Sequence, residues 1–132
     1  MSFLLDTDTC SAYVKGDPRV FTRFVQYGGR LYVSTIVLGE LLAWALRARA
    51  PVQRLQDVRD LLKLVSVLDV SQDVSWKFGE VHAALLDAGT PAPDLDLFNG
   101  AVALVHSLTV VTHNVKDYAN IPGLSITDWL VP

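Results

Sequence analysis

Hydrophobic positions along this chain follow two spacings, which predict strands and helices in alternation. Short apolar runs are typical of buried strands, and they occur at residues 3–5, 31–33, 67–68, 109–111 and 124–126. Apolar residues at every third or fourth position predict helices over residues 9–15, 20–25, 35–50, 55–65, 71–88 and 94–108. Strands that alternate with helices indicate an α/β fold with a mainly parallel central sheet flanked by helices.

The composition is that of a folded chain of modest size. Its 132 residues lie within the ~100–200 residues usual for one domain, so we expect a single domain over residues 1–132. A hydrophobic fraction of 51% and a charged fraction of 19% exclude an intrinsically disordered protein. The net charge of −3 excludes a protein that holds nucleic acid through overall basicity alone.

Two further observations bear on where the protein acts. Cys10 is the only cysteine, which excludes a disulfide framework and favours a reducing compartment. The first residues lack the basic segment of a secretory signal. The longest nearly uncharged stretch, residues 31–46, is shorter than the ~20 residues that span a bilayer. We therefore expect a cytoplasmic protein with no membrane partner.

Acidic residues stand beside the ends of predicted strands and near the start of predicted helices. Asp6 directly follows the first strand, and Asp117 lies beyond the strand at 109–111. Glu40 stands among apolar residues of one predicted helix, and Asp96 lies in the first turn of another. Taken singly, each has a structural explanation, as a turn cap, a solvent-facing helix position or a favourable charge at a helix amino terminus.

Taken together, these four carboxylates predict a metal site. Ligands of parallel sheets bind at the carboxyl ends of the strands, and all four side chains can converge on that edge. Converging carboxylates repel one another unless cations lie between them, and ligands that are all oxygens suit Mg²⁺ or Mn²⁺. Such ions lower the pKa of a bound water and stabilise the leaving oxygen of a phosphodiester, which is nuclease chemistry.

Four longer segments extend this hypothesis. They are LLDTDT (4–9), STIVLGELL (34–42), GTPAPDLDLFNGAVAL (89–104) and THNVKDYANIPGL (112–124). Together they resemble the motifs of PIN-domain ribonucleases, and more narrowly those of VapC-type toxins of prokaryotic toxin–antitoxin pairs. The resemblance covers nearly the whole chain in the family's order, and the combination is specific although any one segment alone is not.

This resemblance implies a PIN-like fold and an endoribonuclease that depends on Mg²⁺ or Mn²⁺ and a metal-activated water. Residue by residue, the acidic site of the family, which holds the metal and carries catalysis, matches Asp6, Glu40, Asp96 and Asp117. Its supporting polar residues match Thr112 and Asn114. The resemblance also implies an RNA substrate, a cognate antitoxin that occludes the site, and a homodimer.

The chain departs from the family's pattern in three places. Asp8 stands where the family usually has Asn, and Asp94 adds a carboxylate two residues before Asp96. A register in which Asp94 is the ligand therefore stays open. Phe98-Asn99-Gly100 replaces the usual Leu-Ile-Ala, which places a polar residue and a helix-weakening glycine in that helix. This third departure leaves the local packing and the activity open.

Two other functions stay open at this point. One is a phosphoaspartate phosphotransfer domain, which the sequence faintly resembles in the acidic pair Asp6 and Asp8 and in Asp69 and Lys116, each beyond a strand. This alternative leaves Glu40 without a role. A PIN-like module that binds RNA or antitoxin and cuts nothing would also fit the departures.

Five of the eleven basic residues lie between Arg47 and Lys63. This cluster favours either a phosphate-binding face or a solvated helix pair whose charge Asp57 and Asp60 partly balance. Helices this rich in Leu and Val also suit contact with an antitoxin helix that lies in a groove.

Overall fold

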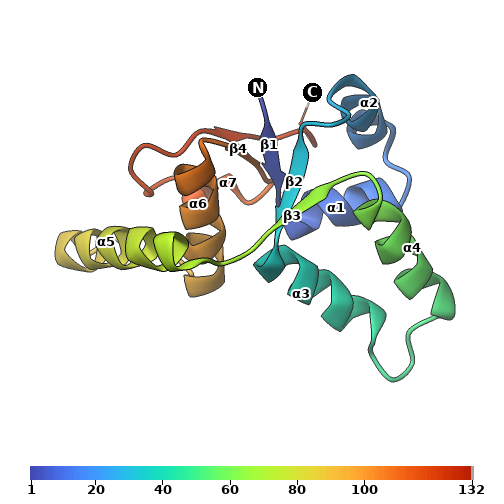
Figure 1. The fold of residues 1–132 in the computed structure, drawn as a ribbon, viewed down its shortest axis with the longest axis horizontal. Helices are drawn as coiled ribbons and strands as arrows, with labels where there is room; N and C mark the ends of the chain where they lie inside the picture. The colour runs from blue at the N-terminus through green and yellow to red at the C-terminus, as the bar shows by residue number, and fades with distance from the viewer. Residues whose placement is uncertain (132) are drawn as a thin grey trace.

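The computed structural model describes residues 1–131 and contains a five-stranded parallel sheet (Figure 1). The strands are β1 (Phe3–Leu5), β2 (Leu31–Ser34), β3 (Ser66–Leu68), β4 (Thr109–Val111) and β5 (Ile126–Thr127). They lie in the order β3-β2-β1-β4-β5. Because β1 is the middle strand, the residue that follows it, Asp6, lies at the centre of the edge formed by the strands' carboxyl ends.

Helices cover both faces of this sheet. They are α1 (Thr7–Val14), α2 (Pro18–Gln26), α3 (Thr35–Ala45), α4 (Val52–Leu62), α5 (Gln72–Ala88), α6 (Asp94–His106) and α7 (Val115–Tyr118). Figure 1 shows α1, α2 and α4 on one side of the strands and α5 and α6 on the other. Successive side chains of a strand point to opposite faces, so Phe3 and Leu5 pack with the first group and Leu4 packs with the second.

The predicted α/β architecture is confirmed, but several predicted bounds are wrong and one helix was not predicted. The helix expected over residues 35–50 ends at Ala45, because residues 47–50 form a separate turn closed by a 2.9 Å bond from Ala50 N to Arg47 O. The last strand is Ile126–Thr127 and not 124–126. The polar segment expected as a loop before Asp117 contains the single-turn helix α7. Such a helix is too short to show a periodic apolar pattern.

Serine side chains cap the starts of two helices, and a glycine ends one of them. Ser34 ends β2, and its Oγ accepts a 3.2 Å bond from Val37 N at the start of α3. Ser71 makes the matching bond to Val74 N of α5. Gly89 ends α5 with φ of 71°, a left-handed conformation that glycine adopts without steric cost. The direct passage from β2 into α3 brings Glu40 of α3 near the carboxyl edge of the sheet.

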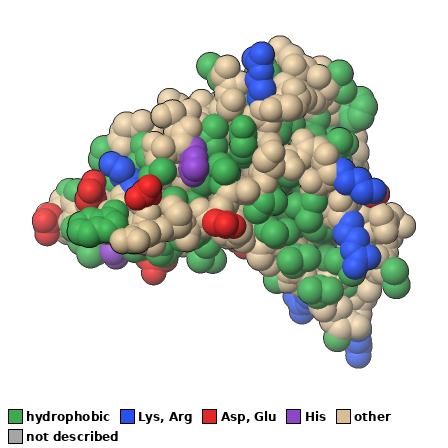
Figure 2. Space-filling view, in the orientation of Figure 1, with side chains coloured by type: hydrophobic (Ala, Val, Ile, Leu, Met, Phe, Trp, Pro, Cys, Tyr) green, Lys and Arg blue, Asp and Glu red, His purple; other side chains and the backbone are tan. Residues whose placement is uncertain are grey.

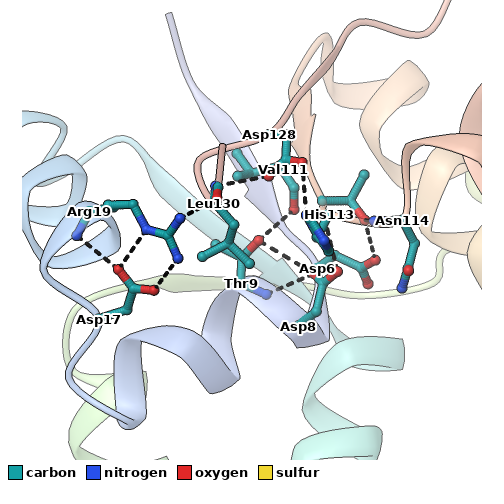
Figure 3. A network of polar contacts seen from close by, with 11 residues as sticks. Asp6, Asp8, Thr9, Asp17, Arg19, Val111, His113, Asn114, Asp128 and Leu130 are labelled. Atoms are coloured by element: carbon teal, nitrogen blue, oxygen red, sulfur yellow. Dashed lines mark hydrogen bonds and ion pairs between the residues drawn. The ribbon is translucent and has the colours of Figure 1, made fainter. Parts of the chain in front are cut away.

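The segment after β5 packs back onto the first half of the chain. Trp129 is buried, and its ring lies against those of Phe3 and Tyr27. Arg19 pairs with Asp17 and donates to the carbonyl oxygen of Leu130 (Figure 3). Within residues 1–131, no helix combines the length and hydropathy that a membrane span requires.

Candidate active site

Asp6 is held rigidly at the carboxyl end of the central strand. It is only 6% exposed, and it caps α1 by accepting a 2.9 Å bond from Thr7 N at Oδ1. Its Oδ2 accepts a 2.9 Å bond from the hydroxyl of Thr112, which follows β4. Burial raises the pKa of Asp6 and the carboxylate of Asp8 raises it further, while both hydrogen bonds oppose the rise. Two neighbouring strands therefore fix this carboxylate from both sides.

Thr7 links Glu40 to Asp6 by hydrogen bonds to both. The Thr7 hydroxyl donates a 2.7 Å bond to Glu40 Oε1, while the Thr7 backbone N–H donates to Asp6. Glu40 is exposed on α3, so the apolar residues around it in the sequence do not bury it. One threonine thus links a buried and a solvent-accessible carboxylate.

Asp96 lies close enough to the other three predicted carboxylates for their charges to affect its pKa. Partial burial and then the negative charges of Asp6, Asp117 and Glu40 raise the pKa of Asp96 to about 6. A 3.5 Å hydrogen bond from the Tyr118 hydroxyl to Asp96 Oδ1 opposes this rise. These carboxylates come from the start of α1, the middle of α3, the first turn of α6 and α7.

Asp94 and Asp8 lie differently from these four. Asp94 is exposed at the first position of α6, and its charge is not among those that raise the pKa of Asp96. Asp8 accepts a 2.7 Å bond from Thr9 N and a 3.0 Å bond from His113 N (Figure 3). Asp8 therefore ties α1 to the loop after β4, although its charge still reaches Asp6.

The two supporting polar residues take unequal parts. Thr112 is fully buried; its hydroxyl donates to Asp6 and accepts a 3.1 Å bond from Asn114 N. Asn114 is exposed, and its side chain does not cap α7. Thr112 thus positions Asp6, whereas Asn114 contacts Thr112 through its backbone N–H.

Asn99 and Gly100, which left the packing of α6 open, have clear roles in the structure. Asn99 is fully buried and bonds at 2.6 Å to the Ser34 hydroxyl and at 3.2 Å to the Tyr118 hydroxyl. A Cβ at Gly100 would lie 2.9 Å from Ile121 Cδ1, which is closer than carbon atoms approach one another. The glycine lets α7 and the turn after it pack against α6.

Sequence reasoning assigned no site role to Thr7, Asn99 or Tyr118. Thr7 and Tyr118 each adjoin a predicted site residue, Asp6 and Asp117 respectively, and this adjacency is the signal that could have found them. Asn99 carried a signal too, since a polar residue within an apolar stretch of a helix calls for a buried partner. Its partner Ser34 lies 65 residues away.

The donor chemistry of the site fits a divalent cation. All four carboxylates supply oxygen ligands, and none of them forms an ion pair with a basic residue within residues 1–131. In the same range, no three acidic, histidine or cysteine side chains are already arranged as a metal site. Hydrogen bonds from Thr7 and Thr112 hold oxygens of Asp6 and Glu40 in place.

The residues proposed for a phosphotransfer site are not brought together. Asp69 follows β3, which is an edge strand separated from β1 by β2. Both Asp69 and Lys116 are exposed, and neither affects the pKa of Asp6. The geometry therefore favours the four-carboxylate site over a phosphoacceptor aspartate.

Known proteins share this fold and length. The PIN-domain family matches residues 3–124. A Salmonella typhimurium protein named tRNA(fMet)-specific endonuclease VapC is 33% identical over 130 residues, which make up 98% of each chain. The crystal structure of DNA-bound VapBC from Salmonella typhimurium has a TM-score of 0.91 and 33% identity over 98% of both chains. VapBC-1 from nontypeable Haemophilus influenzae has a TM-score of 0.87 and 26% identity over 99% of this chain and 100% of its own.

Proposed function

Because this chain belongs to the PIN-domain family, and within it to the VapC-type proteins, we propose that it is an endoribonuclease and the toxin of a toxin–antitoxin pair. The observation that carries the proposal is the group formed by Asp6, Glu40, Asp96 and Asp117. Partial burial and then the charges of the other three carboxylates raise the pKa of Asp96 to about 6, and none of the four has a basic ion-pair partner in the described chain.

The same four residues would hold Mg²⁺ or Mn²⁺. A bound ion of this kind supplies Lewis acidity, which activates a water toward phosphorus and stabilises the departing oxygen. Asp6 offers a fixed ligand, because Thr7 and Thr112 hold its orientation. Glu40 and Asp96 are less buried, so their side chains can turn toward the cation, and Asp117 completes the set. No side-chain nucleophile is required.

The direct test is cleavage of RNA by the purified chain. The pool should contain structured RNAs, including tRNA(fMet), because the name of the Salmonella relative gives that tRNA as its target. Scission with Mg²⁺ or Mn²⁺ that stops with EDTA is the expected result. RNA binding without scission under all three conditions would favour the non-catalytic binding module.

RNA also needs positive charge near this acidic site. Arg47, Arg49 and Arg54 line a hollow of about 500 Å³ in the turn between α3 and α4. Arg54 is fixed there, 4.8 Å above the Trp44 ring and bonded to the Trp44 carbonyl. Figure 2 shows Lys and Arg side chains gathered at lower right, over the α3–α4 hairpin. Glu40 lies about 7.5 Å of helix before the end of α3 at Ala45, and the hollow begins just beyond that end, so a short RNA strand could reach both.

Replacing Arg47 and Arg49 with alanine together is expected to weaken RNA cleavage by about fivefold to tenfold in kcat/KM. Two lost phosphate contacts should also flatten the dependence of log affinity on log salt concentration by about 1–2. The matched control is the double replacement of Arg23 and Arg30, which removes the same charge from α2 and the amino end of β2. Equal losses in the two variants would indicate a general charge effect and no local contact.

Besides occluding the acidic site, the antitoxin would bind a second, apolar surface. Phe21, Val25 and Leu64 are 55%, 70% and 47% exposed and line a groove of about 540 Å³ between α2 and the start of β3. An apolar face of an antitoxin helix would bury these side chains. The groove adjoins the amino ends of β2 and β3, whereas the carboxylates lie at the carboxyl ends.

Replacing Phe21 with aspartate is expected to weaken antitoxin binding at least tenfold and to leave RNA cleavage unchanged. A buried charge without a partner is costly, while the acidic site lies at the other edge of the sheet. Co-purification with the cognate antitoxin measures binding. Leu86→Asp is the matched control, since Leu86 is also 55% exposed but lies on α5. Loss of binding in the control alone would place the antitoxin on α5.

The remaining partner and location also belong to this proposal. The homodimer implied by the family resemblance is tested by light scattering of the purified protein. A cytoplasmic site of action agrees with an RNA substrate and with the free, buried thiol of Cys10.

A further inference from the structure

A buried chain of hydrogen bonds runs from the start of α3 to the carboxylate of Asp96. Ser34 Oγ accepts from Val37 N at 3.2 Å and bonds to Asn99 Oδ1 at 2.6 Å. Asn99 Nδ2 bonds to the Tyr118 hydroxyl at 3.2 Å, and this hydroxyl lies 3.5 Å from Asp96 Oδ1. Ser34, Asn99 and Tyr118 are each fully buried, so the chain is shielded from water.

The chemistry of these groups fixes the direction in which the protons point. Ser34 Oγ accepts the backbone N–H of Val37, which frees its own hydrogen to donate to Asn99 Oδ1. The amide nitrogen of Asn99 then faces Tyr118 and donates to its oxygen. A tyrosine hydroxyl has a single hydrogen, and it keeps that hydrogen at neutral pH. With its oxygen already accepting from Asn99, that hydrogen is left for the nearby carboxylates.

Reversing the amide of Asn99 would remove this donor from the site. The Tyr118 hydroxyl would then donate to Asn99 and present only lone pairs to Asp96. An oxygen facing a carboxylate with no hydrogen between them is repulsive. The negative charges of the acidic side chains therefore select the orientation in which the Tyr118 hydroxyl points its hydrogen at Asp96 and the neighbouring Asp6.

From this geometry we infer that Ser34, Asn99 and Tyr118 are positioning residues that aim the Asp96 carboxylate for divalent-cation binding. The inference rests on the proposed function, because it takes Asp96 as a ligand. Groups that hydrogen-bond to a metal ligand commonly change metal affinity or activity by about 10–100-fold. Asn99 stands where the family pattern has an apolar residue, so this chain makes the contact through residues of its own.

The test compares Tyr118→Phe with the unaltered protein in titrations with Mg²⁺ alone. The variant keeps the ring that packs against α6 and loses only the hydroxyl. Calorimetric Mg²⁺ affinity is expected to fall about tenfold, and the Mg²⁺ concentration for half-maximal RNA cleavage should rise by the same factor. RNA affinity in EDTA should stay within twofold. Asn99→Leu, which removes the amide that directs the hydroxyl, is expected to shift Mg²⁺ affinity in the same direction.

Tyr32→Phe is the matched control, because it deletes a hydroxyl from β2 for which the described chain provides no hydrogen-bond partner. A Tyr118→Phe protein with a lower Tm in EDTA but unchanged Mg²⁺ affinity would show a structural role only and overturn the inference. A wild-type protein that neither binds Mg²⁺ nor cleaves RNA would overturn the proposed function instead. The two failures are therefore distinguishable in one set of titrations.

Discussion

Replacing Asp96 with asparagine is expected to reduce metal-dependent RNA cleavage by about a hundredfold or more. Asparagine keeps the shape of the side chain but removes the charge that would hold a cation. Lewis-acid stabilisation of the transition state is worth several kcal/mol, and about 1.4 kcal/mol corresponds to a tenfold change in rate. The measurement is single-turnover cleavage at saturating protein and Mg²⁺. Asp94→Asn serves as the matched control and should cleave within about threefold of the unaltered protein, because Asp94 is exposed and outside the carboxylate group.

The opposite pattern, with loss in Asp94→Asn and activity in Asp96→Asn, would move the site by two residues along α6. Equal activity in both variants would remove the start of α6 from the chemistry. Either result would also overturn the role inferred for Tyr118, which takes Asp96 as a metal ligand. This pair of variants should therefore be measured before the others.

The same replacement has an opposite effect on stability when metal is absent. The pKa of Asp96 is raised to about 6 in the folded protein, so between pH 4 and 6 the folded state holds more protons than the unfolded state. The contribution of Asp96 to the free energy of unfolding in EDTA therefore falls as pH rises through this range. Asp96→Asn removes the repulsion and should be more stable by about 1–2 kcal/mol at pH 7, after allowance for solvent screening.

Urea unfolding at pH 4 and pH 7 in EDTA measures this difference. At pH 4 the two proteins should have nearly equal free energies of unfolding, because Asp96 is then largely protonated. Addition of Mg²⁺ at pH 7 should stabilise the unaltered protein and not the variant, since a ligand stabilises the state that binds it. A variant that is less stable at pH 7 in EDTA would contradict the assigned repulsion.

Replacing Gly100 with valine is expected to destabilise the protein by about 2–3 kcal/mol. The new Cβ would meet Ile121 Cδ1 at 2.9 Å, and the added methyl groups would press on Leu124 and Tyr118, whose nearest atoms lie at 3.5 and 3.8 Å. Displacement of Tyr118 should also lower cleavage activity, because its hydroxyl contacts Asp96. Thermal and urea unfolding measure the change in stability.

Two comparisons separate overpacking from helix propensity. Gly79→Val makes the same change in α5, where a Cβ would have open space, and should be neutral or slightly stabilising. Ile121→Val removes the Cδ1 that the new side chain would strike, so the double variant with Gly100→Val should recover about 1 kcal/mol relative to the sum of the single changes. Equal destabilisation at Gly79 and Gly100 would show that the contact with Ile121 is not the cause.

Local sequence determined much of the fold and the position of its acidic residues. The apolar run at residues 3–5 predicted β1, and Asp6 directly after it had to stand at the strand's carboxyl end. Ser34 and Ser71 at two helix starts and Gly89 at a helix end are also local features, because caps act through bonds within one turn. The helix α7 was not predicted, since four residues are too few for a periodic pattern.

Tertiary structure alone decided which side chains meet. The sequence indicated Asp6 as the site residue, but only the structure shows that the Thr112 hydroxyl donates to Asp6, whereas Asp8 accepts from the backbone N–H of His113. The same holds for Ser34 and Asn99, and for Gly100 against Ile121. Apolar periodicity and capping depend on neighbours within a few residues. These contacts join residues 21 to 106 positions apart, and they exist only once strand order and helix packing have brought the segments together.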